Sequence, residues 1–190
     1  MAENTFKKKK STKGKKKVGI KLPKLHIAFL QDRRFQLTFG FFLLVSSLFL
    51  VTAFLSYLFT GQADQSVVEG INSVREGGKQ VENWLGLLGA HAAHWFVYRC
   101  FGIAAFLFPP FLFLAGFKIV FNRELYSPWR AAQLVLFFLL WVSLLMGYVL
   151  HGSSTESAWS YLSGALGYEL ATIFDSLVGW GTYLILVFSV

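Results

Sequence analysis

Charged side chains are scarce in this sequence. They make up 15% of its 190 residues, while 55% are hydrophobic and 18% aromatic. A soluble domain carries about 25% charged residues. A water-soluble fold of this length cannot bury so many apolar side chains. The longest apolar runs approach the roughly 20 residues that cross a bilayer. The composition therefore predicts an integral membrane protein.

Cysteine is nearly absent as well. The one cysteine, Cys100, lies inside an apolar run, which excludes a disulfide framework and a cysteine-based metal cluster. A cleavable signal peptide is also disfavoured. The first apolar run, residues 37–59, is longer than the apolar region of such a peptide and is not followed by a small-residue cleavage motif. We interpret it as a retained first span.

Positive charge is concentrated at the N-terminus. Twelve lysines and arginines stand in the first 36 residues against Glu3 and Asp32, whereas the whole chain has a net charge of +8. Residues 1–24 have almost nothing to bury, so we expect a disordered cytoplasmic tail. Beside a membrane span, such a tail is attracted to acidic lipid. The residues expected to contact anionic lipid are Lys7, Lys8, Lys9, Lys10, Lys13, Lys15, Lys16, Lys17, Arg33 and Arg34.

Residues 25–190 are predicted to form an all-α, polytopic membrane helical bundle of about four transmembrane helices. The expected spans are residues 37–59, 96–120, 131–150 and 174–190. The last is short and lacks a terminating basic cluster, so we expect a truncated fourth span in the N-terminal piece of a longer protein. A short interfacial helix is expected within 25–36, and an end to the first helix near Thr60.

Small residues and prolines mark the expected contacts between helices. Pro109 and Pro110 remove backbone donors, and we expect them to kink the second span near its middle. Small residues allow close helix approach, and residues 84–93 are expected to form an interfacial or partly embedded segment. The predicted packing and kink positions are Gly86, Gly89, Ala90, Gly102, Pro109, Pro110, Gly116, Gly164, Gly167, Gly179 and Gly181.

The charges between the apolar runs predict the orientation in the membrane. The connection after the first span carries a net charge of −2, the connection after the second +2, and the residues after the third −3. Basic segments stay on the cytoplasmic side. Both chain ends and the second connection are therefore expected in the cytoplasm, and the other two connections outside.

Few side chains point to chemistry. His91 and His94 have a spacing that places two imidazoles on one helix face, which is compatible with a metal site or with polar packing. Arg99, Glu169 and Asp175 lie in or near apolar segments, where an interfacial ion pair or a transport pathway explains a charge. The sequence contains no phosphate-binding loop or nucleophile elbow. No catalytic residue, metal ligand or cofactor site is assigned.

The runs Asn83–Ala90 and Phe101–Pro110, followed by Gly116, resemble the N-terminal four-span membrane domain of the FtsK/SpoIIIE family of DNA translocases. Gly164–Tyr168 and Gly179–Thr182 are similar to the final section of that domain. The resemblance implies a multi-pass protein of the bacterial inner membrane at the division septum. There the domain anchors and oligomerises a hexameric ATPase that moves chromosomal DNA during cell division.

The family's motor is missing from these residues. Its phosphate-binding loop, ATP, Mg and DNA contacts would all belong to a downstream domain, so this fragment is not expected to be an enzyme. The expected partners are the lipid bilayer, further copies of the chain and other division-site membrane proteins. The alternative is a small polytopic transporter or channel, with Arg99 and the Pro109–Pro110 break lining a pathway.

Overall fold

The structure is a computed structural model that describes residues 32–70, 77–78, 80–151 and 160–189. The expected tail, residues 1–24, and most of the expected interfacial helix at 25–36 lie outside these residues. The main described elements are all helical: α1 Arg33–Gly70, α3 Gly86–Ala93, the π-helix η2 His94–Phe101, the 3₁₀-helix η3 Gly102–Leu107, α4 Phe108–Phe121, α5 Pro128–His151, η4 Ser160–Leu162, α6 Gly164–Val178 and α7 Gly181–Phe188.

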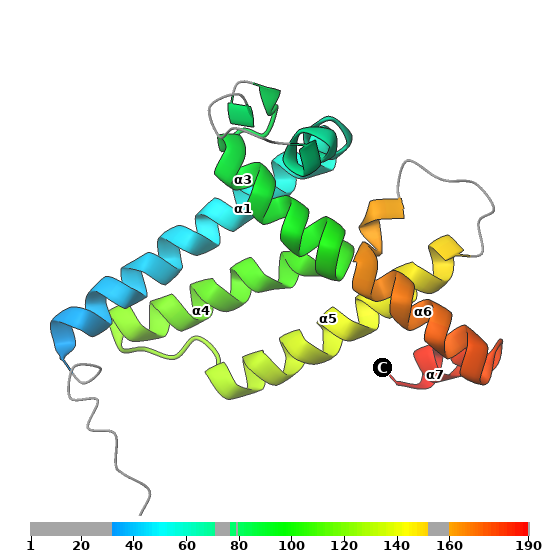
Figure 1. Ribbon diagram of the computed structural model, residues 1–190. Helices are drawn as coiled ribbons and strands as arrows, with labels where there is room; N and C mark the ends of the chain where they lie inside the picture. The colour runs from blue at the N-terminus through cyan, green and yellow to red at the C-terminus, as the bar shows by residue number, and fades with distance from the viewer. Residues whose placement is uncertain (1–31, 71–76, 79, 152–159, 190) are drawn as a thin grey trace, which may run out of the picture.

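Three helices, α1, α4 and α5, form a row in which neighbours run side by side (Figure 1). α1 and α4 are antiparallel and in close contact. A Cβ atom on Gly116 of α4 would lie 2.8 Å from the carbonyl oxygen of Gly40 in α1. Nearer the middle, the Ser47 hydroxyl donates to the Pro109 carbonyl oxygen at 2.7 Å. Because glycine has no side chain, the backbones of α1 and α4 can approach each other closely here.

The segment α3–η2 and helix α6 cross the axes of these three helices and do not run parallel to them (Figure 1). α6 crosses α5 at backbone distance, because a Cβ on Gly147 would overlap the Gly167 carbonyl oxygen. Both crossing segments end at a glycine with positive φ. Gly102 has φ 62° and ψ −140°, and Gly179 has φ 58° and ψ −135°. After each glycine the chain turns, into η3 and α4 in one case and into α7 in the other.

These elements form two units with the same plan. The first unit is α1, α3–η2, η3 and α4; the second is α5, α6 and α7. Each crossing segment also begins at a glycine of positive φ, Gly86 at 64° and Gly164 at 66°. From Gly86 to Gly102 there are 16 residue steps, and from Gly164 to Gly179 there are 15. A π-turn holds one residue more than an α-turn, which accounts for the extra residue in η2.

The two units also have matching cores. Tyr57 of α1 and Tyr148 of α5 are both buried where the crossing segment passes, and the runs SYLFTG from Ser56 and GYVLHG from Gly147 align around them. Beside them lie Ala93 in the first unit and Ala171 in the second. The chain is therefore built from a repeated unit of an ascending helix, a crossing segment and a returning helix.

This arrangement confirms the predicted fold class. Arg33–Gly70, Gly86–Phe121 and Pro128–Leu150 are each long and apolar enough to cross a membrane, and α6 with α7, bent by 118°, gives a fourth candidate. Three expected details are wrong. α1 does not end near Thr60. The second segment turns at Gly102 and not at the prolines, which stand in the first turn of α4, where a missing N–H costs nothing. Residues 174–190 are interrupted at Gly179.

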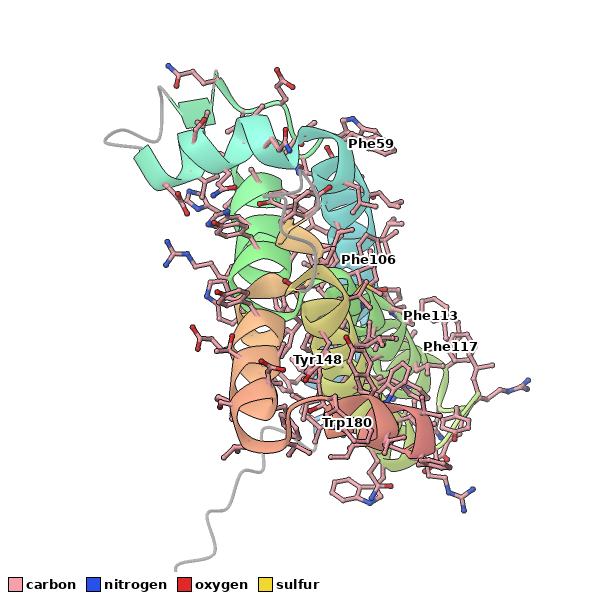
Figure 2. The ribbon with its side chains drawn as sticks, turned by 90° about the vertical axis from the view of Figure 1, so that its right-hand side faces the viewer. Phe59, Phe106, Phe113, Phe117, Tyr148 and Trp180 are labelled. Atoms are coloured by element: carbon pink, nitrogen blue, oxygen red, sulfur yellow. The ribbon has the colours of Figure 1, made fainter. Side chains whose placement is uncertain are left out.

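α1 continues past Thr60 because polar side chains hold its last turns on the bundle. Figure 2 shows this last part of α1 lying across the end of the bundle near Phe59. Asp64 is fully buried and accepts hydrogen bonds from the Thr60 hydroxyl at 2.6 Å and from the Glu82 backbone N–H at 2.7 Å. Its carboxylate therefore joins the extension of α1 to the segment that leads into α3.

Gly147→Ala tests the contact between α5 and α6. The added Cβ overlaps the Gly167 carbonyl oxygen and lies 3.0 Å from the Ala171 Cβ, so the helices must separate. Overpacking of this kind costs about 1–3 kcal/mol, and we expect a lower thermal unfolding midpoint in detergent. The control is Gly70→Ala, where no atom of the described residues lies within 4 Å of the added Cβ. Equal midpoints for the two variants would contradict the packing.

Asp64→Ala tests the attachment of the α1 extension. The change leaves the Glu82 N–H without its acceptor, a loss of about 1–3 kcal/mol for a buried group. We expect residues 65–70 to become cleavable by protease in conditions where the wild-type chain resists. Ser66→Ala is the control, because the Ser66 hydroxyl is exposed and donates only to Ala63 O of its own helix. Cleavage that is unchanged in Asp64→Ala would refute the attachment.

Candidate functional site: a groove between α1 and the first crossing segment

An open groove of about 930 Å³ lies between the last turns of α1 and the segment α3–η2. It exists because the extension of α1 lies across the end of the bundle. Apolar, aromatic and charged side chains share its wall. The lining residues are Val68, Glu69, Leu88, His91, Ala92, His94, Trp95, Phe96 and Arg99.

His94 forms the buried floor of the groove. Its Nδ1 lies 3.3 Å from the Tyr57 hydroxyl, and its ring stacks on Tyr98 with centroids 4.9 Å apart. Its Nε2 lies 3.6 Å from Glu69 Oε1 without a direct hydrogen bond. These contacts fix the imidazole between the two helices that the groove separates.

Arg99 stands on the exposed side of the same groove. Its Nη2 lies 3.7 Å from Glu69 Oε1, and 61% of its side chain is exposed. The carboxylate of Glu69 therefore faces both His94 and Arg99. An ion pair is one of the two explanations that the sequence left open for Arg99. Pro109 is buried beside Ser47, so the structure does not bring Arg99 and the prolines together around one pathway.

The two histidines of the sequence motif have different surroundings. His91 is exposed on the groove wall, whereas His94 is held by Tyr57 and Glu69. Within the part of the chain that the structure describes, no three His, Cys, Asp or Glu side chains gather closely enough to hold a metal ion. The structure thus supplies the polar packing explanation for His94.

The remaining charged candidates belong to the second unit. The Tyr148 hydroxyl lies 2.9 Å from Asp175 Oδ1 and 2.7 Å from the Gly179 carbonyl oxygen. Asp175 therefore helps to hold the turn between α6 and α7. Glu169 is exposed and lines a smaller cavity of about 240 Å³ that Tyr98 also lines. Neither acid lies in the wall of the large groove.

The predicted packing positions divide into two kinds. At Gly102, Gly116, Gly164 and Gly167 a Cβ would meet the backbone of another helical segment, and at Gly89 it would meet the Asn83 side chain. Gly86 and Gly179 instead have open space but a positive φ, which glycine adopts without strain. Ala90 and Pro109 are buried, Pro110 is exposed, and Gly181 lies beside Val178. The sequence did not indicate Gly40 and Gly147, which lie at equally close contacts.

Of the residues expected to contact anionic lipid, only Arg33 and Arg34 fall within the described residues. Arg33 caps the end of α4, since its two terminal nitrogens donate to the carbonyl oxygens of Ile119 and Val120, each at 3.0 Å. Arg34 donates its backbone N–H to Asp32 Oδ1. Lys118 pairs with Glu124 close by. The cationic residues Arg33, Arg34, Lys118, Arg123 and Arg130 stand at the same end of the row.

The arrangement in the groove suits non-covalent binding. Exposed His91, Trp95 and Arg99 stand on a rigid helical wall, and aromatic and arginine side chains in fixed positions are typical anchors of protein interfaces. Glu69, which the sequence showed only as one acid among several in a connection, completes the site. The sequence feature that could have indicated this position of Glu69 is the lack of proline in residues 61–70, which allows α1 to continue that far.

Comparison with known proteins identifies the family. Residues 32–190 match the family described as the 4TM region of DNA translocase FtsK/SpoIIIE. No curated protein and no solved structure matches the chain significantly. The match covers every described helix, and no catalytic domain is detected in the chain. The chain therefore belongs to the FtsK/SpoIIIE family of DNA translocases, and residues 32–190 are its four-span membrane region.

Proposed function

We propose that this chain is the membrane-anchoring and oligomerising N-terminal domain of a cell-division DNA translocase, and that it couples chromosome segregation to the septum of the bacterial inner membrane. The observation that carries the proposal is the family match over residues 32–190, which covers helices that are long and apolar enough to cross a bilayer. ATP, Mg and DNA contacts would belong to a motor after Val190.

The distribution of charge supports a cytoplasmic position for the end of the bundle that carries Arg33. Lys118 lies in the last turn of α4, Arg123 follows α4, and Arg130 lies in the first turn of α5. The Arg33 side chain binds the end of α4. Basic residues next to spans are retained on the cytoplasmic side. The opposite end, with Phe59 and the groove, then faces outward.

The groove supplies the outward contact surface of this proposal. Its exposed Trp95, His91 and Arg99 are held by the buried contacts of His94, so a partner meets an ordered wall. Other division-site membrane proteins with an acidic or aromatic segment are the partners that such a wall would recognise. Anchoring depends on the apolar bundle, whereas recruitment to the septum depends on this surface.

Replacing Trp95 with Ala and Arg99 with Glu tests the contact surface. Losing one interface anchor costs about 2 kcal/mol, roughly a 30-fold weaker contact. A fluorescent fusion of this variant should therefore spread evenly over the membrane, while the wild-type fusion is enriched at the septum. Arg123→Glu, which is exposed at the other end of the bundle, is the matched control and should stay at the septum. Normal septal enrichment of the groove variant would remove the groove from the proposal.

Reporter fusions test the orientation. Alkaline phosphatase, which is active only outside the cytoplasm, should be active when fused after residue 78 or 155 and inactive after residue 125 or 190. A fluorescent protein that folds only in the cytoplasm should give the opposite pattern. The basic residues predict this result through the positive-inside rule. The reverse pattern at residues 78 and 125 would refute the orientation and with it the cytoplasmic place of the motor.

A further inference from the structure

The two repeated units meet at one joint, where the first crossing segment ends and the second begins. A Cβ on Gly102 would overlap the Leu162 carbonyl oxygen, and a Cβ on Gly164 would overlap the Cys100 carbonyl oxygen. The Ser143 hydroxyl of α5 completes the joint and donates to the Phe101 carbonyl oxygen at 2.8 Å. The end of η2 is therefore held against the start of α6 by direct backbone contact.

The outer ends of the same two segments have the backbone shape of this joint, but no second crossing segment packs on their glycines. Gly86 has the φ of Gly164, yet no atom of the described residues lies within 4 Å of its Cβ position. Gly179 has nearly the same φ and ψ as Gly102. A Cβ built on Gly179 would lie 3.8 Å from the Asp175 carbonyl oxygen of its own helix, with no closer contact among the described residues. Figure 1 shows why: α3–η2 and α6 follow one another along a single line, so that the start of α3 and the end of α6 are its two free ends.

The free ends are also apolar. Trp84 is 64% and Leu88 75% exposed at the start of the line, and Leu177 and Trp180 are each 77% exposed at its end. In a membrane such side chains face lipid or another helix, so a second copy can cover these two ends through close packing. The joint within the chain pairs the end of one crossing segment with the start of the other, so its equivalent between chains joins two unlike ends.

We propose that copies of this chain associate head to tail, with the end of α6 in one copy packed against the start of α3 in the next, through the same joint that connects the two units within the chain. The inference rests on the oligomerising part of the proposed function and names its surface. By the alignment of the units, Leu177 takes the place of Cys100, and Trp84 of the next copy takes the place of Leu162.

The rest of the joint has equivalents as well. Gly179 takes the place of Gly102, with similar φ and ψ. Gly86 of the next copy takes the place of Gly164, with a similar φ. Ser143 corresponds to Thr52, another hydroxyl residue on the ascending helix, which in the single chain bonds to Leu48 O of its own helix. In the assembly, the Thr52 hydroxyl faces the Val178 carbonyl oxygen of the neighbouring copy.

A joint between unlike ends leads to more than a dimer. Each pair of copies keeps one free end of each kind, so association continues until a ring closes or a filament grows. The row α1, α4, α5, α7 continues with α1 of the next copy, and the repeat within the chain becomes the repeat of the assembly. The number of copies depends on the small rotation at each joint.

Cysteine cross-linking in native membranes tests the proposal. In a Cys100→Ser background, Trp84→Cys with Leu177→Cys should react with a short thiol cross-linker to give a ladder of dimers, trimers and larger species. The two single-cysteine variants, mixed, should give dimers only. The matched control keeps Cys100 and adds Leu162→Cys, the equivalent pair within one chain, which should cross-link without any ladder.

A second measurement separates this inference from the proposed function. Subunits are counted by stepwise photobleaching of the wild-type chain, of Trp84→Ala with Leu177→Ala, and of Trp129→Ala, an exposed tryptophan at the opposite end of the row. Loss of multi-copy complexes in the double variant alone supports the joint. Wild-type complexes without a cross-linked ladder would overturn the joint but keep oligomerisation, whereas a monomeric wild-type chain would overturn both.

Discussion

Backbone contact at helix crossings is the constraint on which this structure depends. The crossing segments run across the row of membrane-length helices, so each meets its neighbours at a few points. At those points a side chain would keep the helices apart: Gly147 meets the Gly167 backbone, and Gly102 meets Leu162. In a lipid environment helices associate through close packing and not through exclusion of water, so these contacts carry much of the cohesion. Glycine stands there because no other residue fits.

The repeat of one unit explains the positions of the other special residues. Each unit needs a glycine of positive φ to begin the crossing segment and another to end it, and these are Gly86, Gly102, Gly164 and Gly179. The first crossing segment holds one residue more than the second, and the π-helix η2 absorbs it without moving either glycine. The unusual helix type is therefore the local cost of fitting 16 residue steps into a length that α6 covers with 15.

Hydropathy was sufficient to predict an all-helical membrane bundle, because apolar run length reports directly on the bilayer. The turns were harder to predict. Pro109 and Pro110 are conspicuous in the sequence, but a proline in the first turn of a helix does not bend it. The chain turns at Gly102 instead, and nothing in the sequence distinguishes this glycine from the others. The extension of α1 depends on Asp64 finding the Glu82 N–H, a tertiary contact that no local pattern encodes. The two units share few residues in sequence, and the repeat becomes clear only from their backbone angles and matching cores.

The differences between the units locate function better than their common plan does. Tyr57 and Tyr148 occupy equivalent places, yet Tyr57 contacts His94 in the floor of an open groove, whereas Tyr148 contacts Asp175 and closes the turn before α7. The first unit also has a long ascending helix whose extension brings Glu69 over the groove. The same plan thus carries an open groove lined by charged and aromatic side chains in one unit and a structural clamp in the other. Substitutions in the wall of the groove leave the helix crossings in place, whereas an added side chain at Gly102 or Gly147 does not.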